Sequence, residues 1–81
     1  MRYERTPHFK REFRKLNRDV RDAFKKQVQF LLLDIRHPSL RAKKYDETED
    51  VWQARVTRNV RIYFTIRADT YILVNIKKHN D

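Results

Sequence analysis

Cationic side chains at alternating positions in the second half of the chain are suited to binding phosphate. Arg55, Arg61 and Lys77 fall in stretches where apolar and polar residues alternate, and no acidic residue lies between positions 51 and 68. His79 follows Lys77 at the same parity and can transfer a proton near neutral pH. Together these groups suit metal-independent RNA cleavage, in which a 2′-hydroxyl loses its proton and cations stabilise the developing dianion.

Three predicted strands position these cations. Residues 51–56, 60–67 and 71–78 alternate with period two, and three-residue turns at 57–59 and 68–70 connect them into antiparallel hairpins. A one-residue slip would place apolar residues opposite polar ones, so the register is strongly determined. The predicted apolar pairs are Val56–Val60, Ala54–Ile62, Trp52–Phe64, Ile66–Ile72, Phe64–Val74 and Ile62–Ile76.

The opposite face of the same strands is basic. It pairs Arg55 with Arg61 and Arg61 with Lys77, with Tyr63 and Asn75 one step along. Like charges directly opposite each other destabilise a sheet. Their alignment therefore favours a functional interpretation, in which this face is an anion-binding platform with Tyr63 available to stack on a base. The alternative is a solvated strand face whose cations protect the sheet from aggregation.

The elements that precede these strands predict an α+β fold in the order β-α-α-β-β-β-β, with a helical hairpin packed on one face of a small, mainly antiparallel sheet. A short strand at 3–5 leads to a helix that Thr6 caps and Pro7 begins. Asn17 caps a second helix, whose apolar face extends from Val20 to Ile35. A strand at 40–45 and an acidic, solvated loop at 46–50 follow.

The candidate roles divide between catalysis and RNA binding. Arg61 and Lys43 would stabilise the negative charge, with Lys44 as the alternative lysine, and His79 would transfer the proton.

His8 and His37 are interpreted as structural or exposed. No metal site or cofactor is expected, because scattered histidines without cysteine are poor zinc ligands. The residues expected to bind RNA are Arg41, Lys44, Arg55, Tyr63 and Lys77.

Composition restricts the class of protein. The 81 residues carry 20 Lys and Arg against 11 Asp and Glu, a net charge of +9, which indicates a polyanionic partner: nucleic acid, an acidic protein or anionic lipid. The length predicts one domain, residues 1–81. The absence of glycine excludes Gly-rich phosphate loops, and the absence of cysteine excludes thiolate chemistry. With no signal peptide or apolar span, a cytoplasmic location is expected.

Four stretches resemble the RelE/ParE superfamily of toxins from bacterial and archaeal type II toxin–antitoxin modules. They are YERTPHFKREFRKL, HPSLRAKKYD, VWQARVTRNVRIYF and DTYILVNIKKHND, and they cover nearly the whole chain. The resemblance implies a ribosome-dependent mRNA endoribonuclease, neutralised by an acidic antitoxin that wraps the basic sheet face in a hetero-oligomer.

The resemblance also implies individual roles. Arg61 matches the arginine of the family's fourth strand, Lys43 and Lys44 lie in the strand that carries family lysines, and His79 matches a histidine of some RNase branches. Several RNase members place Tyr or Phe at or just after that histidine, where it can stack on the substrate base. This chain has Asn80 and Asp81 there, so the stacking group is missing unless Tyr63 takes its place. The alternatives are a ParE-like DNA gyrase inhibitor and a non-catalytic nucleic-acid-binding relative.

Overall fold

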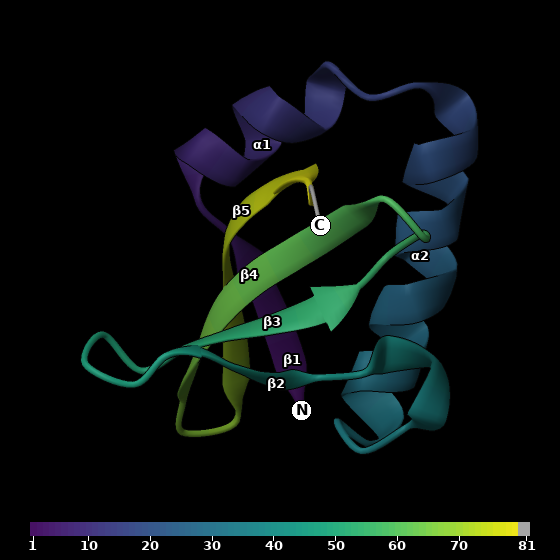
Figure 1. Ribbon diagram of the computed structural model, residues 1–81. Coiled ribbons are helices and arrows are strands. Elements are labelled where there is room, and N and C mark those ends of the chain that lie inside the picture. Colours follow the sequence, from purple (N-terminus) through teal and green to yellow (C-terminus); the bar gives the residue numbers. More distant parts are fainter. Residues whose placement is uncertain (80–81) are drawn as a thin grey trace.

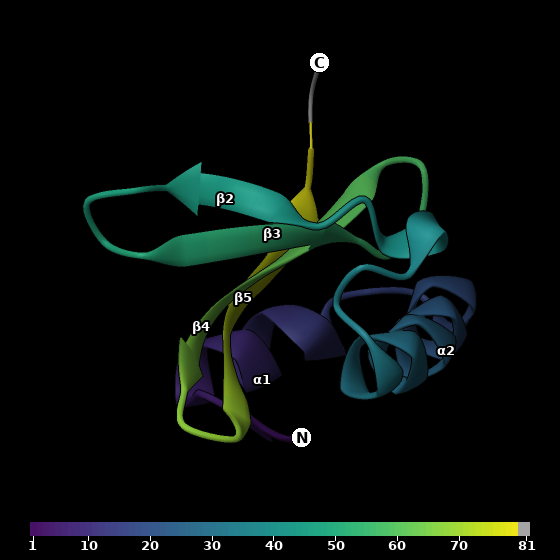
Figure 2. The same ribbon diagram turned by 90° about the horizontal axis from the view of Figure 1, so that it is seen from below.

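Two helices cover one face of a five-stranded sheet in the computed structural model, which describes residues 1–79 (Figures 1 and 2). Positions 80 and 81, where the sequence lacks the family's aromatic residue, lie outside the described residues. The elements in chain order are β1 (Arg2–Arg5), α1 (Pro7–Arg14), α2 (Arg18–Leu33), the 3-10 turn η1 (Pro38–Leu40), β2 (Lys43–Asp46), β3 (Val51–Arg55), β4 (Val60–Arg67) and β5 (Thr70–Lys78).

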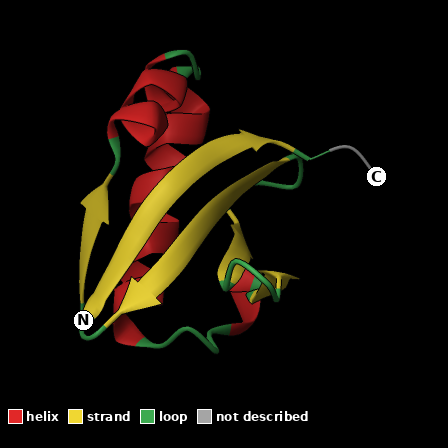
Figure 3. Ribbon diagram, turned by 90° about the vertical axis from the view of Figure 1, so that its left-hand side faces the viewer, coloured by secondary structure: helices red, strands yellow, loops and turns green. Residues whose placement is uncertain are grey.

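The sheet has the strand order β1-β5-β4-β3-β2. Strands β2 to β5 form an antiparallel meander, and β1 lies parallel to β5, with Tyr3 opposite Tyr71. Figure 3 shows the long, strongly twisted β4 and β5 side by side, with the helices behind them. This arrangement confirms the predicted α+β class and the packing of both helices on one face.

Both helices begin where the sequence predicts. The hydroxyl of Thr6 accepts a hydrogen bond from the Phe9 amide at 3.1 Å, and Pro7 occupies the first turn of α1. The side-chain oxygen of Asn17 accepts from the Val20 amide at 3.0 Å at the start of α2. Each cap satisfies a main-chain N–H that has no partner within the helix.

The core fills the space between the helices and the sheet. From the helices, Phe9, Phe24 and Leu31 are fully or almost fully buried, and they face Ile62 and Phe64 of β4. Phe9 and Phe24 contact each other with ring centroids 5.5 Å apart. This packing holds the sheet against the helices and leaves its other face available for polar residues.

The register between β4 and β5 is only partly as predicted. Ile62 pairs with Ile76 as expected, but a bulge follows Tyr63, and Phe64 then pairs with Leu73 rather than with Val74. The extra residue in β5 reverses the parity, so that Leu73 and Tyr71 are buried in the core and Ile72 and Val74 are only partly buried. The predicted Ile66–Ile72 and Phe64–Val74 pairs are therefore wrong.

Three predicted boundaries also need correction. Helix α2 ends at Leu33 rather than at Ile35, and residues 38–40 form η1, so the strand predicted at 40–45 is replaced by β2 at Lys43–Asp46. Arg67 pairs with Thr70, which shortens the predicted three-residue turn to two residues. In the absence of glycine, this turn places Ala68 at φ 51°, a left-handed conformation that is costly for alanine.

None of the helices in the described part of the chain is long and apolar enough to span a membrane.

Candidate nucleic-acid interface

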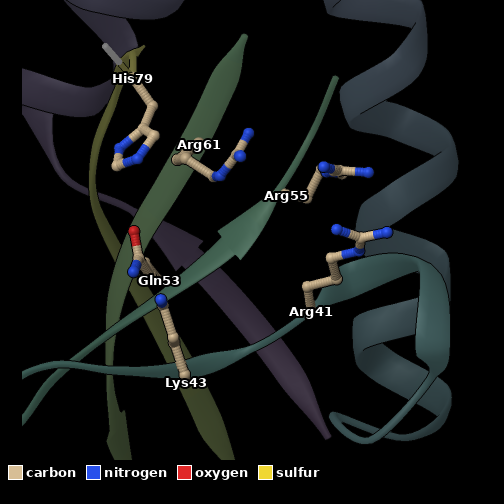
Figure 4. Close-up of a pocket in the computed structure, with 6 residues that line it drawn as sticks. All are labelled: Arg41, Lys43, Gln53, Arg55, Arg61 and His79. Carbon is tan, nitrogen blue, oxygen red and sulfur yellow. The ribbon is translucent and has the colours of Figure 1, made fainter. Parts of the chain in front are cut away.

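A cavity of about 230 Å³ lies on the side of the sheet opposite the apolar core (Figure 4). We call it the basic cavity, and it is lined by Arg41, Lys43, Gln53, Arg55, Arg61 and His79. These residues come from β2, β3, β4, the segment before β2 and the end of β5. None of the described side chains that line it is acidic, so the cavity presents a positive potential suited to an anion.

A row of three cations crosses the sheet at this cavity. Arg55 of β3 pairs with Arg61 of β4, and Arg61 pairs with Lys77 of β5, as the sequence predicts. Arg55 and Arg61 line the cavity, whereas Lys77 extends over the Tyr63 ring, with its Nζ 5.2 Å from the ring centroid. The row therefore supplies two guanidinium groups to the cavity and one ammonium group beside it.

The guanidinium of Arg61 is held by the turn that joins β3 to β4. Its Nη1 donates to the main-chain oxygens of Thr57 at 2.9 Å, Arg58 at 3.2 Å and Val60 at 3.2 Å. The side chain is half-buried, so these bonds restrict its rotamers. A guanidinium fixed in this way is preorganised to stabilise an anion without further ordering.

His79 is brought to the same place by the end of β5. Its main-chain N–H donates to the oxygen of Asn59 at 2.7 Å, which fixes this residue beside the β3–β4 turn. Figure 4 shows the imidazole pointing into the basic cavity, on the side of Arg61 and Gln53. A titratable ring thus shares the cavity with arginine side chains, in an arrangement suited to proton transfer next to a bound phosphate.

The two adjacent lysines of β2 lie on opposite faces of the sheet. Lys43 pairs with Gln53 and lines the basic cavity. Lys44 pairs with Trp52, with its Nζ 5.2 Å from the indole ring, and its ammonium donates to the carboxylate of Asp50. That hydrogen bond raises the pKa of Lys44 above its usual value. Of the two lysines, the structure therefore brings only Lys43 to the candidate site.

Tyr63 lies on the basic face but is buried, with 4% of its surface exposed. Tyr45 packs against it edge to face, with ring centroids 4.8 Å apart, and Lys77 covers it from β5. Burial raises the pKa of the Tyr63 phenol above its usual value. A ring that is covered in this way supports its neighbours and offers little surface to a base.

Two residues at this face were not identified from the sequence. Gln53 lines the basic cavity, and Tyr45 is exposed over 55% of its surface while resting on Tyr63. Each is two positions from a residue already assigned to this face: Gln53 is two positions before Arg55, and Tyr45 is two positions after Lys43. The alternation of β3 counted back from Arg55 would have found Gln53, whereas Tyr45 lies at a register shift between Lys44 and Asp46 that alternation does not describe.

The Gln53 side chain carries a buried acceptor. It is 7% exposed, and its Oε1 has no hydrogen-bond partner among residues 1–79. Figure 4 shows this oxygen directed toward His79 and the amide nitrogen directed toward Lys43. The other described residues that line the cavity are cations and one histidine, so Gln53 contributes its amide acceptor to an environment rich in donors.

The remaining histidines lie away from the basic cavity. His8 of α1 is within 3.2 Å of the side-chain oxygen of Asn75, and His37 stacks on Phe30 with ring centroids 3.9 Å apart. The His37 Nδ1 accepts a hydrogen bond from the Ser39 amide at the start of η1. Within the described residues, no three His, Cys, Asp or Glu side chains are grouped to hold a metal ion.

The fold and the cavity define a class: a small α+β protein with a basic sheet face. A family model described as the ParE toxin of the type II toxin–antitoxin system parDE matches residues 3–81. The chain therefore belongs to the ParE toxin family of type II toxin–antitoxin systems. A search of curated proteins finds no match.

Solved structures of toxins from such systems have the same fold. A YoeB/ParE toxin from Agrobacterium tumefaciens superposes with a TM-score of 0.81 at 8% identity, over 99% of this chain and 100% of that one. An archaeal RelE–RelB complex from Pyrococcus horikoshii superposes with a TM-score of 0.78 at 13% identity, over 95% of this chain and 92% of that one. The E. coli RelBE toxin–antitoxin complex superposes with a TM-score of 0.77 at 17% identity, over 99% of this chain and 98% of that one.

Proposed function

We propose that this toxin is an endoribonuclease that cleaves mRNA on the ribosome and so inhibits translation. The observation that carries the proposal is the basic cavity, in which a histidine, three arginines and a lysine line a space of about 230 Å³. A binding surface for a polyanion needs only cations. A histidine pointing into the cavity supplies the proton-transfer group that RNA cleavage by a 2′-hydroxyl also requires.

Each group has a role in the reaction. The imidazole of His79 takes the proton from a ribose 2′-hydroxyl, whose oxygen then bonds to the adjacent phosphorus. The bond from phosphorus to the 5′-oxygen breaks and leaves a 2′,3′-cyclic phosphate, and the leaving 5′-oxygen takes a proton from the imidazolium or from water to become a 5′-hydroxyl. Arg61 and Lys43 stabilise the extra negative charge on the phosphoryl oxygens. Arg41 and Arg55 hold the phosphate backbone.

Tyr45 and Tyr63 act as a pair in this proposal. The exposed Tyr45 ring provides the face on which a base stacks, and the buried Tyr63 ring beneath it fixes its orientation. Tyr45 is two residues along β2 from Lys43, at the register shift between Lys44 and Asp46. A base on Tyr45 would thus belong to a nucleotide adjacent to the phosphate in the cavity.

The partner that restrains this activity is an acidic antitoxin. The basic face of the sheet presents the cations that line the cavity. An acidic segment that binds across this face would cover the cavity and exclude RNA. Membership of a type II toxin family supports such a partner, and the archaeal and E. coli neighbours are complexes of RelE with RelB. A hetero-oligomer of toxin and antitoxin is the expected resting state.

The test is a purified translation reaction in which the 5′ ends of the mRNA are mapped. Ribosome-dependent cuts are expected with the unaltered protein, and both Arg61→Ala and His79→Ala should slow them by about a hundredfold or more. Arg67→Ala and His8→Ala are matched controls, because Arg67 is exposed at the end of β4 and His8 lies in α1, outside the basic cavity. Intact mRNA during normal translation, or cuts that persist in both cavity variants, would contradict the proposal.

A second candidate, inhibition of DNA gyrase, is favoured by the family match to ParE. It uses the same fold as a protein-binding module and needs no proton-transfer group. Induced DNA breaks and an SOS response, with translation unaffected and His79→Ala fully toxic, would establish it in place of the nuclease. Arrested translation with intact DNA would eliminate it.

A further inference from the structure

A second groove, which we call the helix groove, adjoins the basic cavity between α2 and the end of β3. It has a volume of about 430 Å³ and is lined by residues of α2, η1 and β3. Arg41 and Arg55 line both the basic cavity and the helix groove. Figure 4 shows these two side chains extending side by side toward α2, so the two hollows are joined through a pair of guanidinium groups.

The floor of the helix groove is built from satisfied hydrogen bonds. The buried Gln27 of α2 donates from Nε2 to the main-chain oxygens of Arg55 at 2.9 Å and Ser39 at 3.2 Å, and its Oε1 accepts from the Ser39 hydroxyl at 3.3 Å. This amide joins three elements at one point. The groove is therefore a preformed feature of the fold with a fixed floor.

Its charge distinguishes the helix groove from the hollow on another side of α2. Lys26, Arg41 and Arg55 line the helix groove, and no acidic residue is among its described lining. The other hollow, of about 340 Å³, is also lined by cations, Arg18, Arg21 and Lys25, but it contains the acidic Asp22 and the apolar ring of Phe13. Only the helix groove continues the acid-free, cationic surface of the basic cavity.

We propose that single-stranded RNA continues from the basic cavity into the helix groove, where Lys26, Arg41 and Arg55 bind the phosphate of a flanking nucleotide. This proposal rests on the proposed function and extends its substrate from one scissile phosphate to a longer stretch of backbone. A cationic track of this kind binds single strands without reading their sequence, since its contacts are to phosphate. The affinity gained through the groove is expected only for RNA long enough to occupy both hollows.

The adjacent lysines of α2 supply a matched pair of variants. Lys25 and Lys26 are both exposed, and each substitution by alanine removes one positive charge from the same helix. Binding is measured by fluorescence anisotropy with 2′-O-methyl RNA, which cannot be cleaved, as a dinucleotide and as an oligomer of about eight nucleotides. Lys26→Ala should weaken binding of the oligomer by about fivefold to tenfold, the size of one charge-assisted contact, and leave the dinucleotide unaffected.

The controls separate this proposal from the nuclease proposal. Lys25→Ala should leave both ligands unaffected, and Lys26→Arg should restore the oligomer's affinity. The slope of log affinity against log salt should fall by about 0.7 in Lys26→Ala, corresponding to one lost phosphate contact. Equal losses in Lys25→Ala and Lys26→Ala would overturn the helix-groove proposal and leave the basic cavity in place. The helix-groove proposal would also be overturned if Lys26→Ala weakened the binding of an acidic peptide but left the binding of the RNA oligomer unchanged. Failure of the unaltered protein to bind the oligomer would also overturn the helix-groove proposal, whereas the proposed function is tested separately by the ribosome-dependent cuts.

Discussion

Arg61 donates a hydrogen bond from its guanidinium to the main-chain oxygen of Thr57 at 2.9 Å, across the turn between β3 and β4. The same Nη1 reaches two further carbonyl oxygens of that turn. One face of the guanidinium therefore stabilises the hairpin, while the side chain lines the basic cavity. This double use links the geometry of the candidate site to the stability of the hairpin that carries it.

Arg61→Lys should separate charge from geometry. Lysine keeps the positive charge but lacks the planar guanidinium that meets the turn and the cavity together, so RNA cleavage should fall about tenfold or more. Arg61→Ala should cause a loss of about a hundredfold, as when a transition-state donor is removed. Both variants should lose about 1 kcal/mol of unfolding free energy through the missing turn contacts. Cleavage rates and urea unfolding measure the two effects, and a fully active Arg61→Lys would show that charge alone suffices.

The adjacent lysines of β2 should differ in RNA binding. Lys43 lines the basic cavity, whereas Lys44 lies against Trp52 and Asp50 on the other face. Lys43→Ala should therefore lower RNA affinity by about fivefold, and Lys44→Ala should leave it nearly unchanged. Anisotropy titrations at one fixed salt concentration compare the two directly. Equal losses would mean that binding depends on net charge and not on position.

Tyr45 should bind RNA through its ring and not through its hydroxyl. Tyr45→Phe keeps an aromatic face on top of Tyr63 and should retain the affinity for RNA. Tyr45→Leu keeps apolar bulk without the π-face and should cost about 1–3 kcal/mol of binding free energy. A loss of the same size in the phenylalanine variant would assign the contact to the hydroxyl group.

Tyr63 should titrate late and make the fold sensitive to alkali. Burial raises the pKa of its phenol in the folded state, whereas an exposed tyrosine ionises near pH 10. The unfolded chain therefore releases this proton first, and stability should fall as pH rises above about 10. Tyr63→Phe should reduce that fall and remove one late-titrating phenol from the absorbance titration. An unchanged titration curve would show that another tyrosine is responsible.

Gln27 should contribute to stability through the contacts that form the floor of the helix groove. Gln27→Met keeps the length of the side chain but leaves the carbonyl oxygens of Ser39 and Arg55 without this donor, at a cost of about 1–3 kcal/mol. Gln29→Met is the matched control, because Gln29 is exposed on the same helix. Thermal unfolding of the two variants measures the difference. Equal melting temperatures would show that the buried amide adds little.

The local parts of the fold and the row of cations followed from the sequence, because their causes are local. Thr6 and Asn17 cap helices through atoms only three residues away, and the apolar stripe of α2 has a period of its own. The short β3–β4 turn fixes the pairing of Arg55 with Arg61 within a few residues. The cationic row could therefore be placed before any tertiary contact was known.

Other features depend on contacts that are distant in sequence. The bulge after Tyr63 reverses the parity of β5, and it follows from packing Leu73 and Tyr71 into the core beside β1. Sequence periodicity describes a regular strand and carries no signal for such an insertion. The same limit applies to the parallel pairing of β1, whose partner is separated from it by both helices and three strands.

The composition of the site was decided by the tertiary structure. Alternation alone does not tell which of Lys43 and Lys44 faces the cavity, because the register of β2 depends on its pairing with β3. Tyr63 was placed on the correct face, but its burial under Tyr45 and Lys77 arises from neighbouring strands. Strand parity was enough to place cations and a histidine on one sheet face, because parity is a local property of the chain. Only the packed structure decided which of them converge on one cavity, because convergence depends on the twist and order of the strands.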